Sequence, residues 1–151
     1  MEEGIEKSFD AIIKENFKIE EVNLSEYSPL TLAYIGDCVY DLVIKTINVG
    51  RGNKQVNKLH EETSHLVNAK TQSLMMRTIQ EMLTQEEHDV FKRGRNTKSV
   101  STAKNQSVTD YRRATGFEAL IGYLYLKHEY GRIVELIKIG LSNVAVEDNN
   151  E

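Results

Sequence analysis

Two acidic residues stand inside strongly apolar stretches of the sequence, and they are the first candidates for chemistry. Asp37 lies in LAYIGDCVYDLV, and Glu118 lies in TGFEALIGYLYL. Moving an ionised carboxylate out of water is costly unless a cation or hydrogen-bond donors compensate for it. Two interpretations are open. Either each acid lies on the exposed side of its helix or pairs with Arg or Lys, as most charged residues do, or the two acids converge on a metal ion.

A glycine stands close to each acid, which favours the second interpretation. Gly36 directly precedes Asp37, and Gly122 follows Glu118 by four residues. Glycine inside a helix costs up to about 1 kcal/mol relative to alanine, so it usually has a packing reason. Two such glycines would let their helices cross closely and bring both carboxylates to one hard cation such as Mg²⁺. A metal ion there would activate water for attack on phosphorus.

Other catalytic schemes fit the sequence less well. His60 and His65 are five residues apart rather than the four of a helical zinc-protease motif, which separates them by about 140° around a helix. Cys38 is the only cysteine, and a lone cysteine in an apolar helix is more often packed than reactive. Asp41, one turn after Asp37, either assists a metal site through water or is an exposed helix acid, which is the favoured account. The sequence also has no glycine-rich phosphate loop, which disfavours a nucleotide hydrolase.

The basic residues are concentrated in one segment. The net charge of −4 argues at first against a nucleic-acid partner. However, residues 1–28 hold eight acidic and three basic side chains, whereas residues 92–113 hold seven basic side chains and one acidic one. Such asymmetry indicates a binding site for a polyanion, with a solvated surface loop as the alternative.

The elements that must position these residues are helices. The sequence has one proline and no tryptophan, its apolar residues recur at i, i+3, i+4 and i+7, and no convincing strand alternation occurs. We therefore predict an all-α fold. The expected helices cover residues 5–17, 29–48, 54–83 with a break near Ser64, 85–94, and 108–128, and a last helix follows Gly131.

Capping residues mark where several of these helices begin. Ser28 stands before the only proline, and Thr84 with a glutamate three residues later forms a capping box. Ser107 or Thr109 caps the helix that carries the second acid. The polar stretch RNTKSVSTAKNQS before that helix has no apolar periodicity and predicts a long loop, either functional or disordered.

We expect one globular domain. A chain of 151 residues, 40% hydrophobic, can build one core and has no room for a second of similar size. We assign residues 1–23 to an N-terminal helical extension, 24–146 to the domain and 147–151 to a disordered tail. No apolar run approaches the roughly 20 residues that span a bilayer, and the acidic N-terminus lacks the apolar region of a signal peptide. With a single cysteine, the sequence fits a reducing, cytoplasmic location.

These motifs resemble a known family. LAYIGDCVYD is similar to the signature helix of the ribonuclease III endonuclease domain, and TGFEALIGYLYL is similar to its second acidic helix. KRGRNTKS, the downstream KN, YRRATGFEALIGYLYL and KLHEETSHLVNAKTQ resemble Mini-ribonuclease III in particular. The resemblance covers roughly Leu24 to Lys127. No double-stranded-RNA-binding domain follows in the sequence, which fits the Mini form.

The resemblance implies a fold and a reaction. The fold is the all-α ribonuclease III endonuclease domain, a helical bundle that forms a homodimer through the signature helices, with two symmetric sites in a valley across the dimer. By position, Asp37 and Glu118 are the catalytic residues and the ligands of Mg²⁺. The activity is metal-dependent cleavage of double-stranded RNA that leaves 5′-phosphate and 3′-hydroxyl ends. The implied substrate is precursor large-subunit (23S) ribosomal RNA, and a large-subunit ribosomal protein is a candidate partner.

The resemblance also gives the basic segment a role, because A-form RNA is recognised mainly by its shape and backbone. Lys54, His60 and Lys70 are weaker candidates, with ordinary surface positions as the alternative. The residues expected to contact RNA are Lys92, Arg93, Arg95, Asn96, Lys98, Lys104, Arg112 and Arg113.

The chain departs from full ribonuclease III at three positions. Leu30, Ala33 and Thr115 stand where the full enzyme has acids. Mini-ribonuclease III lacks these acids too. The number of metal ions per site, one or two, is therefore open. A catalytically inactive ribonuclease III-like RNA-binding module in ribosome assembly is the alternative function. Retention of Asp37 and Glu118 favours the enzyme. A helical protein-interaction domain without RNA is a third interpretation, and the clustered basic charge argues against it.

Overall fold

The computed structural model describes residues 6–97 and 107–148, and this part of the chain is helical with no strand. The all-α prediction is confirmed. In chain order the elements are α1 (Phe9–Asn16), the 3₁₀ helix η1 (Leu24–Glu26), α2 (Pro29–Gly50), α3 (Val56–Val67), α4 (Ala69–Ile79), the 3₁₀ helix η2 (Gln80–Met82), α5 (Gln85–Asn96), α6 (Val108–Leu126) and α7 (Tyr130–Asp148).

The predicted caps begin the helices as expected. The Ser28 hydroxyl accepts a backbone hydrogen bond at the start of α2. Thr84 and Glu87 form both halves of the capping box that starts α5, with hydrogen bonds of 3.1 and 2.8 Å. Of the two candidate caps for α6, Ser107 is the one that accepts a backbone N–H. Side-chain oxygens thus satisfy the first free N–H groups of the helices that carry the site.

Two predicted helix boundaries are wrong. The break between α3 and α4 falls at Asn68 rather than near Ser64, because the Asn68 backbone is extended and its side chain caps α4. Gly131 lies inside α7 and does not separate the last two helices. His128 ends α6 instead, since its φ of 64° places it in the left-handed region.

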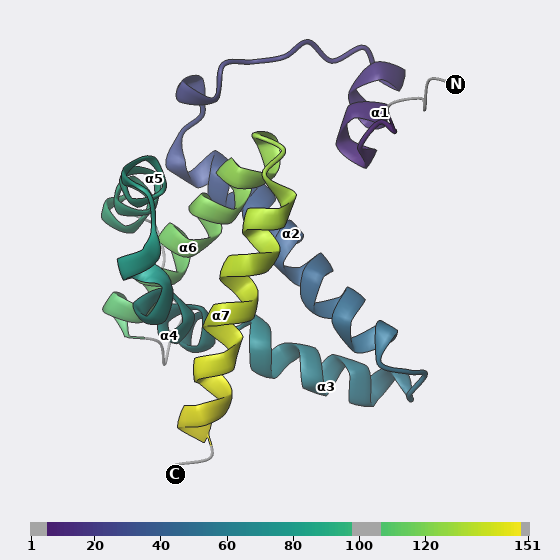
Figure 1. The fold of residues 1–151 in the computed structure, drawn as a ribbon, viewed down its shortest axis with the longest axis vertical. Helices are drawn as coiled ribbons and strands as arrows, with labels where there is room; N and C mark the ends of the chain where they lie inside the picture. Colours follow the sequence, from purple (N-terminus) through teal and green to yellow (C-terminus); the bar gives the residue numbers. More distant parts are fainter. Residues whose placement is uncertain (1–5, 98–106, 149–151) are drawn as a thin grey trace.

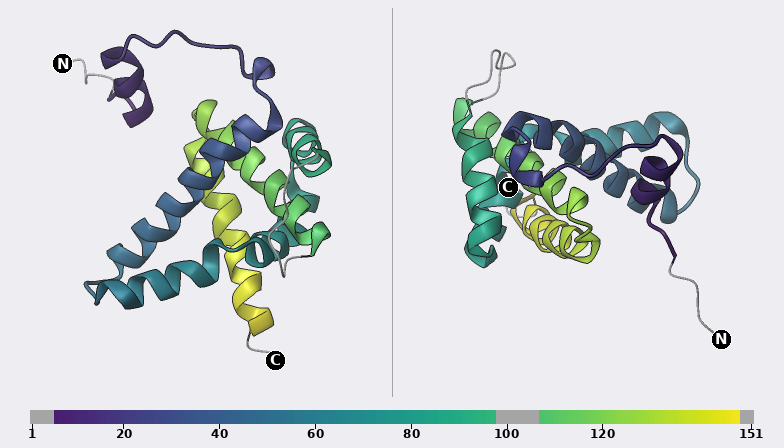
Figure 2. Two further views of the ribbon diagram at one scale, coloured as in Figure 1. Left: turned by 180° about the vertical axis from the view of Figure 1, so that it is seen from behind. Right: turned by 90° about the horizontal axis from the view of Figure 1, so that it is seen from above.

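Helix α6 lies at the centre of the fold. It packs against α2, α4, α5 and α7, as Figure 1 and the two views of Figure 2 show. Helices α2 and α3 meet at a turn at one end and diverge towards the bundle, while α1 lies at the edge of the bundle on the side away from α5. No helix in residues 6–97 and 107–148 has the length and apolarity to cross a membrane.

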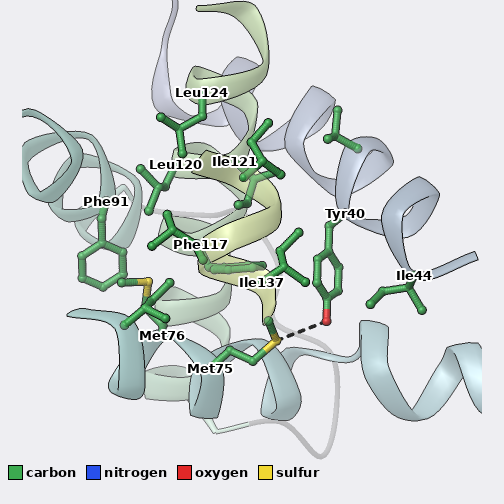
Figure 3. Close-up of a cluster of buried hydrophobic side chains, with 14 of the residues drawn as sticks. Tyr40, Ile44, Met75, Met76, Phe91, Phe117, Leu120, Ile121, Leu124 and Ile137 are labelled. Atoms are coloured by element: carbon green, nitrogen blue, oxygen red, sulfur yellow. Dashed lines mark hydrogen bonds between the residues drawn. The ribbon is translucent and has the colours of Figure 1, made fainter. Parts of the chain in front are cut away.

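The core surrounds one fully buried tyrosine (Figure 3). The Tyr40 ring packs edge-on against Phe117 at 5.3 Å, and its hydroxyl donates to the Leu66 carbonyl at 2.5 Å. The Sδ atom of Met75 lies 3.2 Å from the same hydroxyl. Burial without an ionic partner raises the pKa of Tyr40, so it stays a neutral core residue. This cluster fixes α2, α4 and α6 relative to one another.

Candidate active site

Two glycines let α2 and α6 touch backbone to backbone. A Cβ atom added at Gly36 would lie 1.7 Å from the Glu118 carbonyl oxygen, and one added at Gly122 would lie 1.9 Å from the Leu32 carbonyl oxygen. No side chain fits at either position. The close crossing expected from the sequence is therefore present, and it sets Asp37, next to Gly36, beside the turn of α6 that carries Glu118.

A second pair of glycines joins α5 to α6. A Cβ atom at Gly94 would lie 2.9 Å from the Cβ of Ala119, and one at Gly116 would lie 2.7 Å from the Phe91 ring. This contact places the C-terminal end of α5 against the turn of α6 that precedes Glu118. The sequence analysis missed this pair, although a glycine within each predicted helix was the available signal.

The two carboxylates interact unfavourably with each other. Burial raises the pKa of Glu118 to about 8, and the charge of Asp37 adds to the increase. Partial burial, and after it the charge of Asp41, raises the pKa of Asp37. Asp37 is an exposed residue, as the simpler interpretation held, and Glu118 is half-buried. Within the described part of the chain, neither acid has a basic partner in an ion pair.

This arrangement suits a cation from solution. The pKa of each carboxylate is raised by burial and by a neighbouring acid, Asp37 for Glu118 and Asp41 for Asp37, so the site lacks positive charge. Carboxylate oxygens are the donors that Mg²⁺ prefers. No third His, Cys, Asp or Glu joins them in a metal-binding cluster among residues 6–97 and 107–148. Asp41 instead forms an exposed ion pair with Lys45 at 3.0 Å. The exposed-acid account of Asp41 is therefore the one that the geometry favours.

The three positions where full ribonuclease III has acids differ from one another in their exposure to solvent. Ala33 and Thr115 are buried, each 8% exposed, and Leu30 is exposed. The Thr115 hydroxyl donates to the Tyr111 carbonyl within α6. The described site thus consists of the Asp37 and Glu118 carboxylates and the backbone contact between α2 and α6 that holds them.

Four of the eight predicted RNA-binding residues, Lys92, Arg93, Arg95 and Asn96, lie in the C-terminal half of α5. Arg95 lies over the Phe91 ring at 5.5 Å, and its Nε donates to Asn96. Lys98 and Lys104 fall outside the described residues. The exposed members of the predicted set are Lys92, Arg93, Asn96 and Arg112.

Arg113 has a different environment from the rest of the set. Its side chain is 19% exposed and donates to Ser73 at 2.9 Å, while the Ser73 hydroxyl donates to Asp110 at 2.7 Å. The Ser73 hydrogen bond, followed by Ser107 and the positive charge of Arg113, holds the pKa of Asp110 below its usual value. Arg113 thus ties α4 to the start of α6. Sequence reasoning missed Ser73, because one serine in an amphipathic helix gives no signal of a buried partner.

The weaker RNA-binding candidates are surface residues. Lys54 pairs with Glu62 at 2.9 Å. His60 and Lys70 are exposed. None of the three is close to Asp37 or Glu118 in the sequence, and none forms an ion pair with either acid in the described part of the chain.

Known proteins are similar to this chain in sequence and in fold. Residues 30–129 match the Ribonuclease III domain family. The chain is 48% identical over 130 residues to Mini-ribonuclease 3 of Clostridium tetani, which covers 85% of this chain and 86% of that protein. It is 42% identical over 137 residues to Mini-ribonuclease 3 of a Thermoanaerobacter species, with 91% and 96% covered. A crystal structure of a Fusobacterium nucleatum protein matches with a TM-score of 0.73 and 30% identity, and covers 82% of this chain and 98% of that one.

Proposed function

We propose a reaction and a site for this chain from the premise that it belongs to the ribonuclease III family, among the Mini-ribonuclease 3 proteins. Enzymes of this family are metal-dependent endoribonucleases that act on double-stranded RNA, and this chain is one of them. The proposed substrate is precursor large-subunit ribosomal RNA, cut to give 5′-phosphate and 3′-hydroxyl ends. The observation that carries the site is the Asp37–Glu118 pair beside the glycine crossing.

Asp37 and Glu118 would hold Mg²⁺, which when bound supplies a Lewis acid and an activated water. The protein's own part is to fix two carboxylates on two helices that cannot slide apart without losing the Gly36–Gly122 contact. Because burial raises its pKa to about 8, Glu118 carries a proton near neutral pH and must release it to act as a ligand. Metal affinity is therefore expected to rise with pH.

The basic end of α5 would bind the duplex beside this pair. Lys92, Arg93 and Asn96 are exposed there, and Arg112 is exposed on α6. Such side chains suit the phosphates and 2′-hydroxyls of A-form RNA, whose shallow minor groove offers shape and backbone to read. Arg113, already bonded to Ser73, would act mainly by holding α6.

The exposed face of α2 supports a homodimer. Tyr34, Leu42 and Val49 are 81%, 60% and 64% exposed, and Cys38 lies exposed between the first two. The spacings of four, four and seven residues keep Tyr34, Cys38, Leu42 and Val49 on one face of α2. A two-fold dimer would cover this face, which we call the α2 stripe, and would place two sites in one valley. A cytoplasmic location and a ribosomal protein partner stay predictions.

One experiment tests the assignment directly. Purified protein is incubated with a long RNA duplex, with and without Mg²⁺, beside Asp37→Asn and the matched control Asp41→Asn. We expect Mg²⁺-dependent cleavage by the wild type and by Asp41→Asn, and binding without cleavage by Asp37→Asn. A wild type that binds the duplex but never cuts it would favour the RNA-binding module instead.

A second experiment tests the binding surface. Replacing Arg93 and Arg95 by alanine should weaken duplex binding and reduce the slope of log affinity against log salt by about two, since each phosphate contact releases counterions. The control replaces Lys7 and Lys18, two exposed lysines near the N-terminus. An equal slope in the two double variants would place the RNA elsewhere.

A further inference from the structure

Residues 6–28, which we call the arm, precede the segment that matches the Ribonuclease III domain family. The arm contains α1 and an extended connection to α2, and it runs outside the helical bundle (Figures 1 and 2). Its large apolar side chains face solvent: Phe9 is 74% exposed, Phe17 is 75% exposed and Ile19 is 53% exposed. Grouped apolar side chains of this size on a surface commonly mark an interface.

The arm is attached to the bundle by polar contacts. Asp10, only 6% exposed, accepts a hydrogen bond from the Tyr130 hydroxyl at 2.5 Å and lies 2.8 Å from Nε2 of His128. Burial acts to raise the pKa of Asp10, but the hydrogen bonds from Tyr130 and Ser8 and the charge of His128 outweigh it and lower the pKa. The polar side of α1 thus makes this contact and leaves the apolar side uncovered.

The attachment point borders the α2 stripe. Burial raises the pKa of Tyr125, and the nearby charges of Asp10 on α1 and Cys38 on α2 raise it further. The Tyr125 ring lies 6.1 Å from the ring of Tyr130, which holds Asp10, and Tyr125 stands one turn of α6 after Gly122, which contacts Leu32 of α2. The arm is therefore attached near the part of α2 that bears Tyr34, the first residue of the α2 stripe.

Charge indicates what covers this surface. The connection after α1 carries Glu20, Glu21 and Glu26, whereas the turn between α2 and α3 carries Arg51 and the first turn of α3 carries Lys58, all of them exposed. The middle of α2 (Pro29–Gly50) falls within the α2 stripe, between Cys38 and Leu42. If the two-fold axis of the proposed dimer runs across α2 at that point, the two α2 helices are antiparallel, and the basic turn of one copy lies opposite the residues that precede α2 in the other.

We propose that the arm clasps a second copy of this chain. The apolar side of α1 packs against the α2 stripe of the other copy, and the acidic connection lies along that copy's α2–α3 turn. This inference rests on the proposed dimer and adds to it a contact outside the family domain. Each copy supplies one arm and receives one, as a two-fold interface requires.

The apolar contact is tested by measuring the dimer dissociation constant of the full-length protein by analytical ultracentrifugation. Phe9→Ser with Phe17→Ser should raise the constant at least about tenfold, because truncated aromatic anchors commonly cost that much. Val134→Ser, at a 55% exposed position on α7, is the matched control and should leave it unchanged. Equal constants for the double variant and the wild type would overturn the clasp while leaving the dimer standing.

The ionic contact is tested by charge exchange. Glu20→Arg with Glu21→Arg should weaken the dimer, Arg51→Glu with Lys58→Glu should weaken it too, and the four changes together should restore it. Additive weakening in the combined variant would overturn the pairing of the arm with the turn. A wild type that is monomeric at micromolar concentration would overturn both the dimer and the clasp.

Discussion

Replacing Glu118 by glutamine should stabilise the metal-free protein while destroying its proposed site. Burial raises the pKa of Glu118 to about 8, and the charge of Asp37 adds to that increase, against an ordinary value of 4.5. Because the pKa of Glu118 is higher in the folded than in the unfolded chain, the unfolded chain loses the Glu118 proton first as pH rises. The contribution of Glu118 to folding is fully present below about pH 4.5 and is lost as pH rises towards 8.

The size of the effect follows from the two pKa values. At about 1.4 kcal/mol per tenfold change in proton affinity, the shift lowers stability at pH 8 by at most about 4 kcal/mol relative to acidic solution. For a chain of this length, 1 kcal/mol corresponds to roughly 2–4 °C in Tm. Glu118→Gln, which cannot ionise, should therefore raise Tm at pH 8 by on the order of 5–15 °C and leave it nearly unchanged at pH 5.

Thermal unfolding followed by circular dichroism in EDTA, from pH 5 to 9, measures this difference. Glu61→Gln, at an exposed position on α3, is the control and should follow the wild-type curve. Added Mg²⁺ should raise the Tm of the wild type at pH 8 and have little effect on Glu118→Gln. Parallel curves for the wild type and Glu118→Gln across the whole pH range would refute the reasoning about the carboxylate pair.

Three further substitutions, and Gly50→Ala as a control for the first, test the fold by equilibrium denaturation in urea. Gly36→Ala should lower the free energy of unfolding by at least about 3 kcal/mol, because its Cβ would lie 1.7 Å from a backbone oxygen of α6. Gly50→Ala should be neutral or stabilising, because nothing lies within 4 Å of the added Cβ. Arg132→Met should cost about 3–5 kcal/mol, since it leaves the 5% exposed Glu87 without its cation; a loss below 1 kcal/mol would contradict this. Thr84→Ala should cost about 1 kcal/mol through loss of the α5 cap, and an unchanged midpoint would show that the capping box adds nothing.

Local chemistry made most of the helices predictable from the sequence. Ser28 and Thr84 are strong caps whose effect depends on neighbouring backbone groups only. The failures occurred where two residues compete for one boundary. Asn68 ends α3 and caps α4 at once, and His128 adopts a left-handed conformation more typical of glycine, so Gly131 gave a misleading signal.

The carboxylate pair was predictable because glycines stood near both acids, and glycine within a helix carries information about a distant backbone. The Ser73–Arg113 contact was not, since it joins residues 40 positions apart and neither residue type is unusual where it stands. Arg113 and Arg112 look equivalent in the sequence. Only the packing of α4 on α6 separates the arginine that binds within the fold from the one that faces solvent.

The residues that replace these acids limit the charge repulsion at the proposed metal site. Ala33 and Thr115, where full ribonuclease III has acids, are each 8% exposed and lie one turn from Asp37 and Glu118 respectively. A carboxylate at either position would be buried one turn from an existing acid, and its desolvation and like-charge repulsion would destabilise the fold unless a cation were bound. Without those acids, the charge that raises the pKa of Glu118 is that of Asp37, and one proton on Glu118 relieves this repulsion. The close crossing of α2 and α6 can thus form without a metal ion, and a cation held by the proposed site would take the place of that proton.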